Sequence, residues 1–454
     1  MSRALDLAES ALEAAEGDGA EAFVHSERSG LARYAASEVH QPTLIEDTFV
    51  RLRVVRDGKV GSALSNRIDA EGLVELATRA GVVADSARPD PDFPGFASPA
   101  DPPSVEGYDE ETASLGADDQ ARLAAAAIAG GDGIGMYGYF TSGVTETAIA
   151  STTGVANQQT VTDAVCMCLA AAEEASGFAV KTGWRVSDVD VEHAGREAAE
   201  KAARTRGARD LELGHYRAVL EPYAIADLLL WFGFDSLGGL GYVEERSYFC
   251  GRIGERAFDP QVSLADDALD PEGLPTAFDF EATPKRRVEL IEEGVIRSVV
   301  WDRATAARAG DSQESTGHAP PDSWKYLGPL TCALSMTGGD AESTEELAAR
   351  VGDGIYVTRL HYLSIVDPRE GILTGMTKDG TFRIRDGKVA EPLINLRFTV
   401  SLPEVLADLP GLTRERELVN LNDFYGERFS LAALVPGIAT ARFNITGTGS
   451  GPGL

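Results

Sequence analysis

The sequence predicts a protein that mixes helices and strands, with helices and long strands in its N-terminal half and mainly short strands after residue 216. Three observations predict this division. Some segments place apolar residues at helical spacing, others alternate or are rich in β-branched residues, and Gly, Pro and Asp turns divide the second half into short pieces. With 454 residues, 43% of them hydrophobic, the chain can bury substantial cores, and two or three domains are expected.

The N-terminal elements begin with an amphipathic helix over residues 2–16, where apolar side chains form one stripe. Alternation and β-branching then predict three strands: Ala22–His25, Leu31–Ala35 and Asp47–Val55. An Asp57-Gly58 turn is expected to fold the third of these against Val60–Leu64 as a hairpin. A second helix is predicted over Ala70–Ala84.

The stretch Arg88–Val105 contains six prolines and shows no periodicity, so it is expected to be a linker or a strap across the surface. After it the pattern predicts a helix, two strands joined by a turn at 152–154, and a further helix: Ala117–Ala129, Gly138–Ala150, Gln158–Ala171 and Asp190–Arg206. We place a domain boundary near residues 207–215. It separates an N-terminal domain, 1–207, which the stretch 88–105 could divide further, from a C-terminal domain, 213–454.

In the C-terminal half, helices are expected at Tyr223–Phe232 and Thr344–Val351. Two hairpins have an acidic residue and a glycine at the tip, which is the strongest short-range hairpin signal. They are Arg287–Ile291 with Val295–Trp301, and Thr381–Ile384 with Val389–Pro392.

The charge balance limits the classes of function. The chain has 72 Asp and Glu against 41 Lys and Arg, a net charge of −31, which argues against a nucleic-acid binder that neutralises phosphates. Only seven of the basic residues are Lys, and we interpret the acidity as adaptation to concentrated salt. Four scattered cysteines, no signal peptide and no long apolar run predict a reduced cytoplasmic protein without a membrane span.

No local motif for catalysis is found. The six histidines are never closer than 15 residues, no His-Glu pair occurs, and no nucleophile elbow is present. A metal site assembled from distant residues such as His318, Cys332 and His361 remains an alternative to ordinary surface or core histidines. We expect Gly238–Gly241 to cap a helix C-terminus, and we assign the acidic pair Asp266-Asp267 to the solvated surface.

Four blocks of the sequence resemble the TldD/PmbA family, the so-called modulators of DNA gyrase, whose better supported role is in peptide and protein processing. In chain order they are Arg51–Ala63, Ser151–Thr162, Phe278–Gly310 with its LIEEGV element, and Gly371–Phe398 with TGMTKDGTF and PLINLRF. The resemblance implies an α+β fold: N-terminal helices on a β-sheet, then a mainly antiparallel C-terminal domain that forms a barrel or sandwich.

The resemblance also implies a subunit type. TldD-type chains carry His-Glu-x-x-x-His on a helix at the start of the C-terminal domain and act as zinc metalloproteases, whereas TldE (PmbA) chains lack it and pair with a TldD chain. The matching helix here, Glu221–Leu229, has no His, and the last cysteine is Cys332, so the late Cys ligand of the family has no counterpart. The chain therefore resembles the noncatalytic type, with no metal-binding or cofactor-binding residue of its own and with zinc expected in its partner.

The function expected on this basis is a subunit that positions or encloses unfolded peptides for a TldD-like metalloprotease partner, with a homodimer as the other assembly. Two alternatives remain. One is a self-sufficient hydrolase around His361 and Tyr362, facing the turn at Thr374–Thr377. The other is a binding module that regulates a topoisomerase or another partner. The substrate, and whether this chain has activity of its own, are left open.

Overall fold

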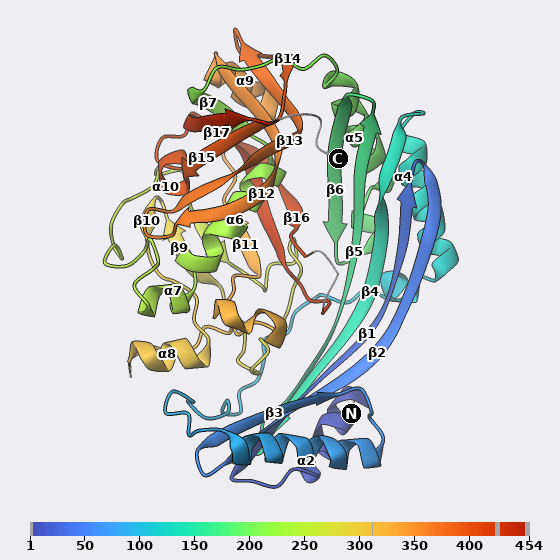
Figure 1. Cartoon of the computed structure of the whole chain (residues 1–454), viewed down its shortest axis with the longest axis vertical. Helices are drawn as coiled ribbons and strands as arrows, with labels where there is room; N and C mark the ends of the chain where they lie inside the picture. Colours follow the sequence, from blue (N-terminus) through green and yellow to red (C-terminus); the bar gives the residue numbers. More distant parts are fainter. Residues whose placement is uncertain (1–2, 311, 423–426, 450–454) are drawn as a thin grey trace.

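Two β-sheets organise the chain, as Figure 1 shows for the computed structural model, which describes residues 3–310, 312–422 and 427–449. The N-terminal sheet is antiparallel throughout, in the order β3-β2-β1-β4-β5-β6. Its strands are β1 (Gly19–Ala35), β2 (Glu38–Arg56), β3 (Lys59–Ser65), β4 (Gly135–Ser151), β5 (Ala156–Ala172) and β6 (Ala175–Gly183). The helices of this half are α1 (Arg3–Glu13), α2 (Ala70–Ser86), α3 (Glu110–Ser114), α4 (Ala117–Gly130) and α5 (Val191–Arg204), with a 3₁₀ turn at Val186–Asp188.

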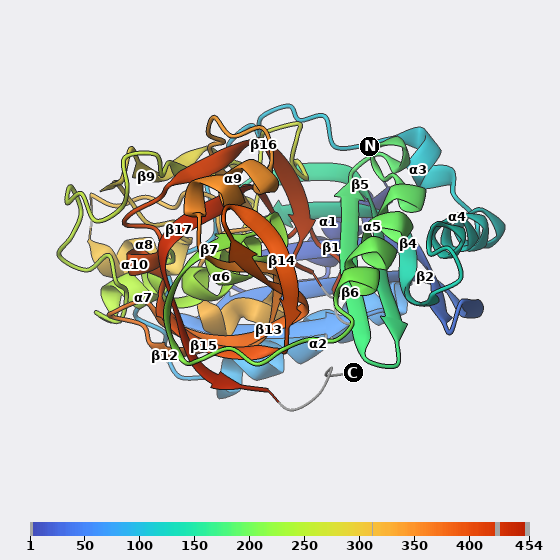
Figure 2. The same ribbon diagram turned by 90° about the horizontal axis from the view of Figure 1, so that it is seen from above.

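Helices cover the N-terminal sheet in two places. At one end, α1 and α2 pack their apolar faces on β1 and β2, and Gly61 of β3 allows close contact, since a Cβ there would lie 2.2 Å from the carbonyl oxygen of Ala80 in α2. Elsewhere α4 and α5 pack small side chains on β4–β6, around the buried rings of Tyr34 and Phe140. Figures 1 and 2 show α4 and α5 on the face turned away from the C-terminal domain.

The C-terminal sheet has eleven strands in the described residues. They are β7 (Gly214–Leu220), β8 (Leu264–Asp266), β9 (Val288–Glu292), β10 (Val295–Ile296), β11 (Ala333–Met336), β12 (Gly354–Asp367), β13 (Ile372–Arg385), β14 (Lys388–Leu393), β15 (Leu396–Ser401), β16 (Gly411–Asn420) and β17 (Ala432–Thr448). Because β17 pairs with both β15 and β7, the strands β17-β15-β13-β12-β7 close into a ring. Among the strand pairs of the described residues in this sheet, only β7–β12 and β11–β17 are parallel.

The helices of this half are α6 (Pro222–Ser236), α7 (Gly239–Val243), α8 (Arg303–Ala309), α9 (Thr344–Val351) and α10 (Leu402–Val405), with a 3₁₀ helix at Asp322–Leu327. The largest apolar cluster forms around α6, whose side chains Ile225, Leu228, Leu229 and Phe232 pack with residues of the barrel strands. Among the residues described, no helix combines the length and apolar character needed to cross a bilayer.

The predicted α+β fold, the barrel-like C-terminal domain and the hairpins are confirmed, the hairpin at β9 and β10 with a shorter second strand than expected. The two strands expected at 22–25 and 31–35 are one continuous strand, β1. The prediction for Gly238–Gly241 is wrong in detail. Gly238 precedes the short helix α7, and Gly239 lies so close to the indole of Trp301 that a Cβ would be 2.3 Å from the ring.

The assignment of Asp266 to the solvated surface is also wrong, because its side chain is fully buried and accepts a hydrogen bond from Nε2 of His318 at 2.9 Å. Burial alone would raise the pKa of Asp266, but the contact with His318 outweighs it, and the pKa is lowered. Burial lowers the pKa of His318, which favours the neutral ring. The two residues form a structural pair in the C-terminal core.

The two halves also contact each other through buried polar groups. Arg51 of β2 binds Asp322 at 2.7 Å and the carbonyl oxygen of Phe280 at 3.1 Å. Figure 1 shows the long strands β1, β2, β4 and β5 curving past the C-terminal domain. Two pockets between that domain and the sheet are lined by residues of both.

Candidate functional site

Helix α6 forms one wall of a cleft between the two halves. It begins directly after β7, with Pro222 at its first turn, where the missing N–H costs nothing. Its apolar residues enter the core on most sides. One face, with Tyr223, Asp227, Leu230 and Trp231 at the i, i+4, i+7 and i+8 positions, lines the cleft instead.

The cleft has a volume of about 630 Å³, in the range of ligand-binding pockets. Strands β4, β5 and β6 contribute Tyr139, Met167 and Phe178 from the N-terminal sheet. Opposite them lie α6, β12 and the residues that end β16, among them Asn420 and Asn422. The walls are therefore largely apolar with a few polar groups, as in sites that bind an organic ligand or a peptide.

The two site residues predicted from the sequence, His361 and Tyr362, both lie in this cleft. They occupy an irregularity of β12, where the register against β13 shifts between His361 and Ser364. Tyr362 has φ of +51°, which is uncommon for a non-glycine residue, and its side chain is 80% exposed. The centroids of the His361 and Tyr362 rings are 4.2 Å apart. Burial lowers the pKa of His361, helped by Lys378 and Arg359, so the ring is neutral at pH 7.

Asp227 is a cleft residue that the sequence analysis missed. Burial raises its pKa to about 7, although the charge of Arg359 acts in the opposite direction. Arg359 itself lies 3.3 Å from Asp379 and stacks over the ring of Phe178 at 3.9 Å. The available signal was one acidic residue within the apolar run AIADLLLWF. A carboxyl group that titrates near neutral pH in a cleft is a candidate functional group.

The cleft does not suit a zinc ion. Throughout the described part of the chain, no group of three His, Cys, Asp or Glu side chains is placed to hold a metal. The residues proposed for a distributed site are separated: His361 lines the cleft, Cys332 lines a different cavity, and His318 is held by Asp266 and by Thr316 at 2.9 Å. Burial also raises the pKa of Cys332 to about 12, which disfavours the thiolate that metals bind.

We expect the purified chain to bind no stoichiometric zinc, because α6 presents Leu230 and Trp231 to the cleft and contains no His. Elemental analysis after mild chelator dialysis should find less than about 0.1 zinc per chain. About one zinc per chain, lost in a His361→Ala variant, would contradict this and would favour the distributed site.

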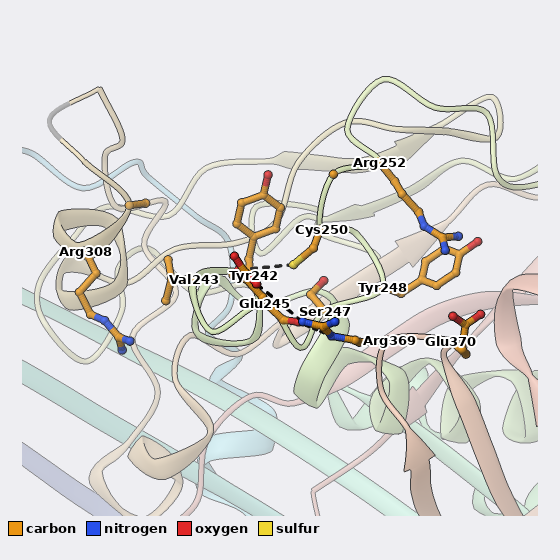
Figure 3. Close-up of a pocket in the computed structure, with 12 residues that line it drawn as sticks. Tyr242, Val243, Glu245, Ser247, Tyr248, Cys250, Arg252, Arg308, Arg369 and Glu370 are labelled. Atoms are coloured by element: carbon orange, nitrogen blue, oxygen red, sulfur yellow. Dashed lines mark hydrogen bonds and ion pairs between the residues drawn. The ribbon is translucent and has the colours of Figure 1, made fainter.

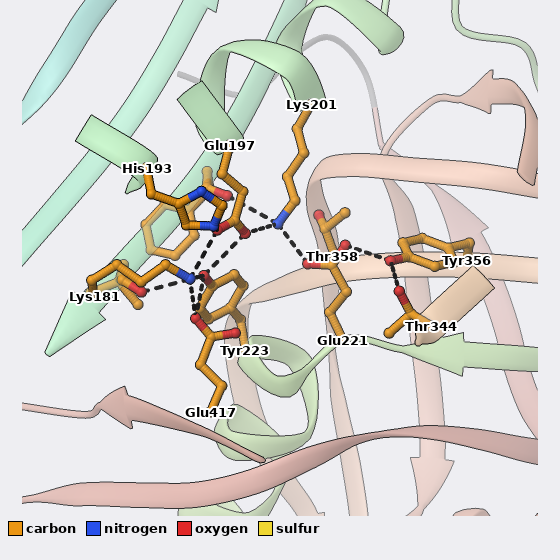
Figure 4. Close-up of polar contacts among 12 residues, drawn as sticks. Lys181, His193, Glu197, Lys201, Glu221, Tyr223, Thr344, Tyr356, Thr358 and Glu417 are labelled. Carbon is orange, nitrogen blue, oxygen red and sulfur yellow. Dashed lines mark hydrogen bonds and ion pairs between the residues drawn. The ribbon is translucent and has the colours of Figure 1, made fainter. Parts of the chain in front are cut away.

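A buried network of charges fixes the start of α6 to the N-terminal domain, as Figure 4 shows. Nζ of Lys201 in α5 lies 2.7 Å from Glu197 and 2.6 Å from Glu221, the residue before α6. Glu221 in turn accepts a hydrogen bond from Tyr356 at 2.8 Å. Lys181 of β6 binds Glu197 and Glu417, and Tyr223 lies 3.0 Å from Glu417.

The network shifts the pKa values of its members in opposite directions. Burial would raise the pKa of Glu197, but Lys201 and Lys181 outweigh it and lower the pKa to about 2. Burial raises the pKa of Glu221, against the pull of Lys201. The pKa of Lys201 is raised by both carboxylates, although burial acts against this. We infer that these contacts hold α6 at a fixed position against β6 and α5.

The same network covers the free edge of the N-terminal sheet. In the described residues β6 pairs with β5 alone, so its other edge has backbone groups without a strand partner. Nζ of Lys201 donates to the carbonyl of Phe178 at 3.3 Å, and the hydroxyl of Tyr223 lies 3.3 Å from the carbonyl of Val180. This edge is therefore protected against strand addition.

A second cleft, of about 670 Å³, lies on the loops of the C-terminal domain (Figure 3). Among its charged side chains, Arg369 pairs with Glu245 at 3.7 Å. Arg252 lies over the ring of Tyr248 at 4.1 Å, and Nε of Arg369 donates to the carbonyl of Glu245 at 2.7 Å. Cys250 donates to the carbonyl of Tyr242 at 3.4 Å, and burial raises the pKa of its thiol. Nothing in this cleft resembles an activated nucleophile.

Three profiles of one family match successive parts of the chain. They are PmbA/TldA metallopeptidase domain 1 at residues 20–84, the central domain at 108–206 and the C-terminal domain at 213–447. Among characterised and curated proteins, a metalloprotease from Methanothermobacter thermautotrophicus is 28% identical over 235 residues, 49% of this chain and 48% of that protein. A metalloprotease TldD homolog from Haemophilus influenzae is 26% identical over 177 residues, 38% of this chain and 36% of that one. The chain thus matches about half the length of the first of these relatives.

Solved structures share the fold at lower identity. TldE from Thermococcus kodakarensis superimposes with a TM-score of 0.86 at 20% identity, covering 97% of this chain and 99% of that one. A candidate modulator of a DNA gyrase from Thermotoga maritima gives 0.81 at 18% identity, with coverages of 94% and 96%. At these identities the matches establish the architecture.

Proposed function

Because this chain belongs to the PmbA/TldA metallopeptidase family, we propose that it is a noncatalytic, TldE-like subunit of a TldD/TldE-type protease complex. The observation that carries the proposal is the cleft face of α6. The resemblance places the zinc ligands of catalytic chains on this helix, whereas here the face consists of Tyr223, Asp227, Leu230 and Trp231. A TldD-like partner would supply the metal and the base, and this chain would position and enclose an unfolded peptide.

The cleft has the chemistry for such a role. Its aromatic and aliphatic walls can take apolar side chains of a peptide, while Asp227 and Arg359 can bind its polar groups. A pKa of about 7 for Asp227 means that the carboxyl group can either donate to a carbonyl or accept from an N–H near neutral pH. The main chain of an extended peptide presents carbonyl and N–H groups in alternation. Because every residue carries these groups, we expect the cleft to show little preference for peptide sequence.

One strand edge available for the partner is that of β2. Strand β3 pairs only with Val50–Arg56, so residues 38–49 of β2 pair with β1 on one side and with no strand of the described chain on the other. Leu44 and Ile45 on this segment are 60% and 42% exposed. A long exposed edge with apolar side chains favours strand addition, and burying it in a dimer would also protect it from aggregation.

The test is reconstitution. Mixing the chain with a TldD-like partner should produce cleavage of an unstructured peptide that a chelator abolishes, while each chain alone should be inactive. A Leu44→Lys variant should weaken complex formation by at least tenfold, because it places a charge in the contact. Leu64→Lys, at a similarly exposed site on β3, is the matched control. Chelator-resistant cleavage by the isolated chain would refute the proposal.

The strained bulge of β12 favours one other candidate, a hydrolase site of this chain centred on His361 and Tyr362. Neutral His361 has the protonation state of a general base. If this candidate were right, the isolated chain would hydrolyse a peptide or ester, and His361→Ala would abolish the activity. The same substitution in the noncatalytic subunit should leave the maximal rate of the complex largely unchanged.

A further inference from the structure

Arg359 of β12 is a cation whose hydrogen-bond donors are only partly used by the fold. Its side chain lines the cleft beside α6 and is 18% exposed. Nη1 lies 3.3 Å from Oδ2 of Asp379, yet neither oxygen of that buried carboxylate accepts a hydrogen bond from a described residue. The pair is therefore held by charge and is not the two-bond fork that Arg often forms with a carboxylate. Because a guanidinium has five N–H donors, it can still bind a ligand in the cleft.

The ring of Phe178 supports this guanidinium. Cζ of Arg359 lies over the ring, 3.9 Å from its centroid, and Phe178 lines the same cleft. An aromatic support of this kind holds the guanidinium in place before a ligand arrives, so less conformational entropy is lost on binding. A held guanidinium matches a planar acceptor with two oxygens, which is the shape of a carboxylate.

Positive charge prevails around Arg359, although the chain as a whole is strongly acidic. Lys378 of β13 lies opposite Arg359 in the strand register. Burial lowers the pKa of His361, and the charges of Lys378 and Arg359 lower it further, whereas the opposite effect of Asp379 is smaller. Asp227 is the carboxyl group among the described lining residues, and a pKa of about 7 leaves it partly neutral near pH 7. The cleft therefore favours an anion beside Arg359.

We propose that the cleft binds a carboxylate group of its peptide ligand, with Arg359 as the residue that receives it. The inference rests on the proposed peptide-binding role and adds which group of the peptide is recognised. The C-terminus and the side chains of Asp and Glu share this chemistry. Apolar lining residues such as Leu230 and Trp231 would take the neighbouring side chains of the peptide. Asp227, when protonated, can donate a hydrogen bond to the bound carboxylate.

Binding of a carboxylate is expected to depend on the protonation of Asp227. Burial raises the pKa of this residue to about 7, and the charge of Arg359 opposes the rise. Between about pH 6.5 and 8.5 Asp227 loses its proton, while His361 stays neutral and Lys and Arg stay charged. The new negative charge repels a carboxylate ligand, so the affinity should fall as the pH rises. The other titratable and charged groups of the cleft walls are Tyr139, Lys181, Glu197, Tyr223, Tyr362, Lys378, Asp379 and Glu417.

The experiment measures binding of short peptides to the isolated full-length chain by fluorescence anisotropy, at about 1 M KCl so that long-range repulsion is screened. A dansylated peptide of Leu, Ala and Ser with a free C-terminus is compared with its C-terminal amide and with an amide that carries one Glu. The wild type should bind the free acid at least tenfold more tightly than the plain amide, which lacks the charged acceptor. Tight binding of the Glu-containing amide would show that any carboxylate is recognised, and weak binding would identify the C-terminus.

Variants attribute the preference to Arg359. Arg359→Gln alone would leave buried Asp379 without its ion-pair partner, so it is combined with Asp379→Asn, and this double variant should bind the acid and the plain amide equally. Asp379→Asn alone should keep or increase the preference, because it removes a competing charge. Arg397→Gln, at an exposed arginine of β15, is the matched control and should keep it. Asp227→Asn should abolish the fall in affinity between about pH 6.5 and 8.5.

Equal affinities of the wild type for the free acid and the plain amide would overturn the proposal, as would no binding of either peptide or a preference that the double variant retains. If the double variant does not fold, Arg359→Lys replaces it, since Lys keeps the charge but lacks the planar fork, and an undiminished preference would then overturn the proposal. Reconstitution with a TldD-like partner tests the proposed function separately. Cleavage by the mixed chains without a carboxylate preference refutes this inference alone, and a preference without cleavage refutes only the role in a protease complex.

Discussion

Replacing Lys201 by Met is expected to lower the free energy of unfolding by about 3–5 kcal/mol, the range found when one member of a buried charge pair is removed. Lys201 contacts both Glu197 and Glu221, and its side chain is 11% exposed. Without it, Glu221 keeps only Tyr356 among the described partners of its carboxylate. Denaturant unfolding at fixed salt measures the change, with Lys388→Met, at an exposed lysine, as the control.

A second substitution separates charge from packing. If the loss comes from the unpaired carboxylate, adding Glu221→Gln to Lys201→Met should recover part of the stability, because a neutral amide costs less to bury than a carboxylate. A double variant as unstable as the sum of the single variants would show that Lys201 acts through the packing of its aliphatic chain instead.

The contribution of this network to the stability of the fold depends on pH. The pKa of Glu197 is about 2 in the folded chain against an ordinary value of 4.5, so its contribution is complete above about pH 4.5 and is lost as the pH falls towards 2. The pKa of Lys201 is raised, so its contribution is complete below about 10.5 and is lost at higher pH. In Lys201→Met, the loss of stability between pH 4.5 and 2 should be smaller than in the wild type.

The second large effect is expected from salt. With 31 more acidic than basic residues, repulsion between carboxylates should strongly oppose folding at low ionic strength. The Debye length falls from about 30 Å at 0.01 M to about 3 Å at 1 M, so only near neighbours then interact. Surface ion pairs also weaken in salt, but each contributes only about 0–1 kcal/mol to the free energy of unfolding. The excess carboxylates form no such pairs, so salt only reduces their repulsion. The melting temperature should therefore rise steeply between about 0.1 and 2 M KCl.

Differential scanning calorimetry at several KCl concentrations checks this. A variant with Glu173→Gln and Glu174→Gln, at the exposed turn between β5 and β6, should melt higher in low salt and show a shallower rise. Any dimer should dissociate on desalting for the same reason. A melting temperature that stays flat over this range would show that local ion pairs, not screening, govern the surface.

Much of the local structure was predictable because its causes are local. The hairpin of β2 and β3 follows from an Asp-Gly turn between alternating segments, and α9 from a Ser at its N-cap followed by a helical pattern. The sequence-based prediction failed where contacts with residues distant in the sequence determine whether a side chain is buried. From the sequence, Asp266 is assigned to the surface because pairs of acidic neighbours arise by chance in so acidic a chain, but its partner is His318, 52 residues away.

The candidate site shows the same division. The absence of His from the α6 segment could be read directly, and His361 and Tyr362 were proposed from the sequence. Their position beside Asp227 and Arg359 depends on an irregularity in β12 and on how the N-terminal sheet passes α6. The role of Lys201 could not be predicted either, because the sequence of α5 shows only an amphipathic helix in which Lys201 is one of several charged residues.

The sequence by itself determined the helices of eight residues or more, the hairpins, the family and the lack of zinc ligands on α6, because periodicity, turn chemistry and residue identity can be read along the chain without knowledge of tertiary contacts. The tertiary structure decided which charges are buried, since burial requires side chains from several strands and helices to meet. Two of the seven lysines, Lys181 and Lys201, lie partly or fully buried between the two halves, where their energy depends on whether a carboxylate lies within contact. That condition is set by the packing of the two domains, and no stretch of sequence contains it.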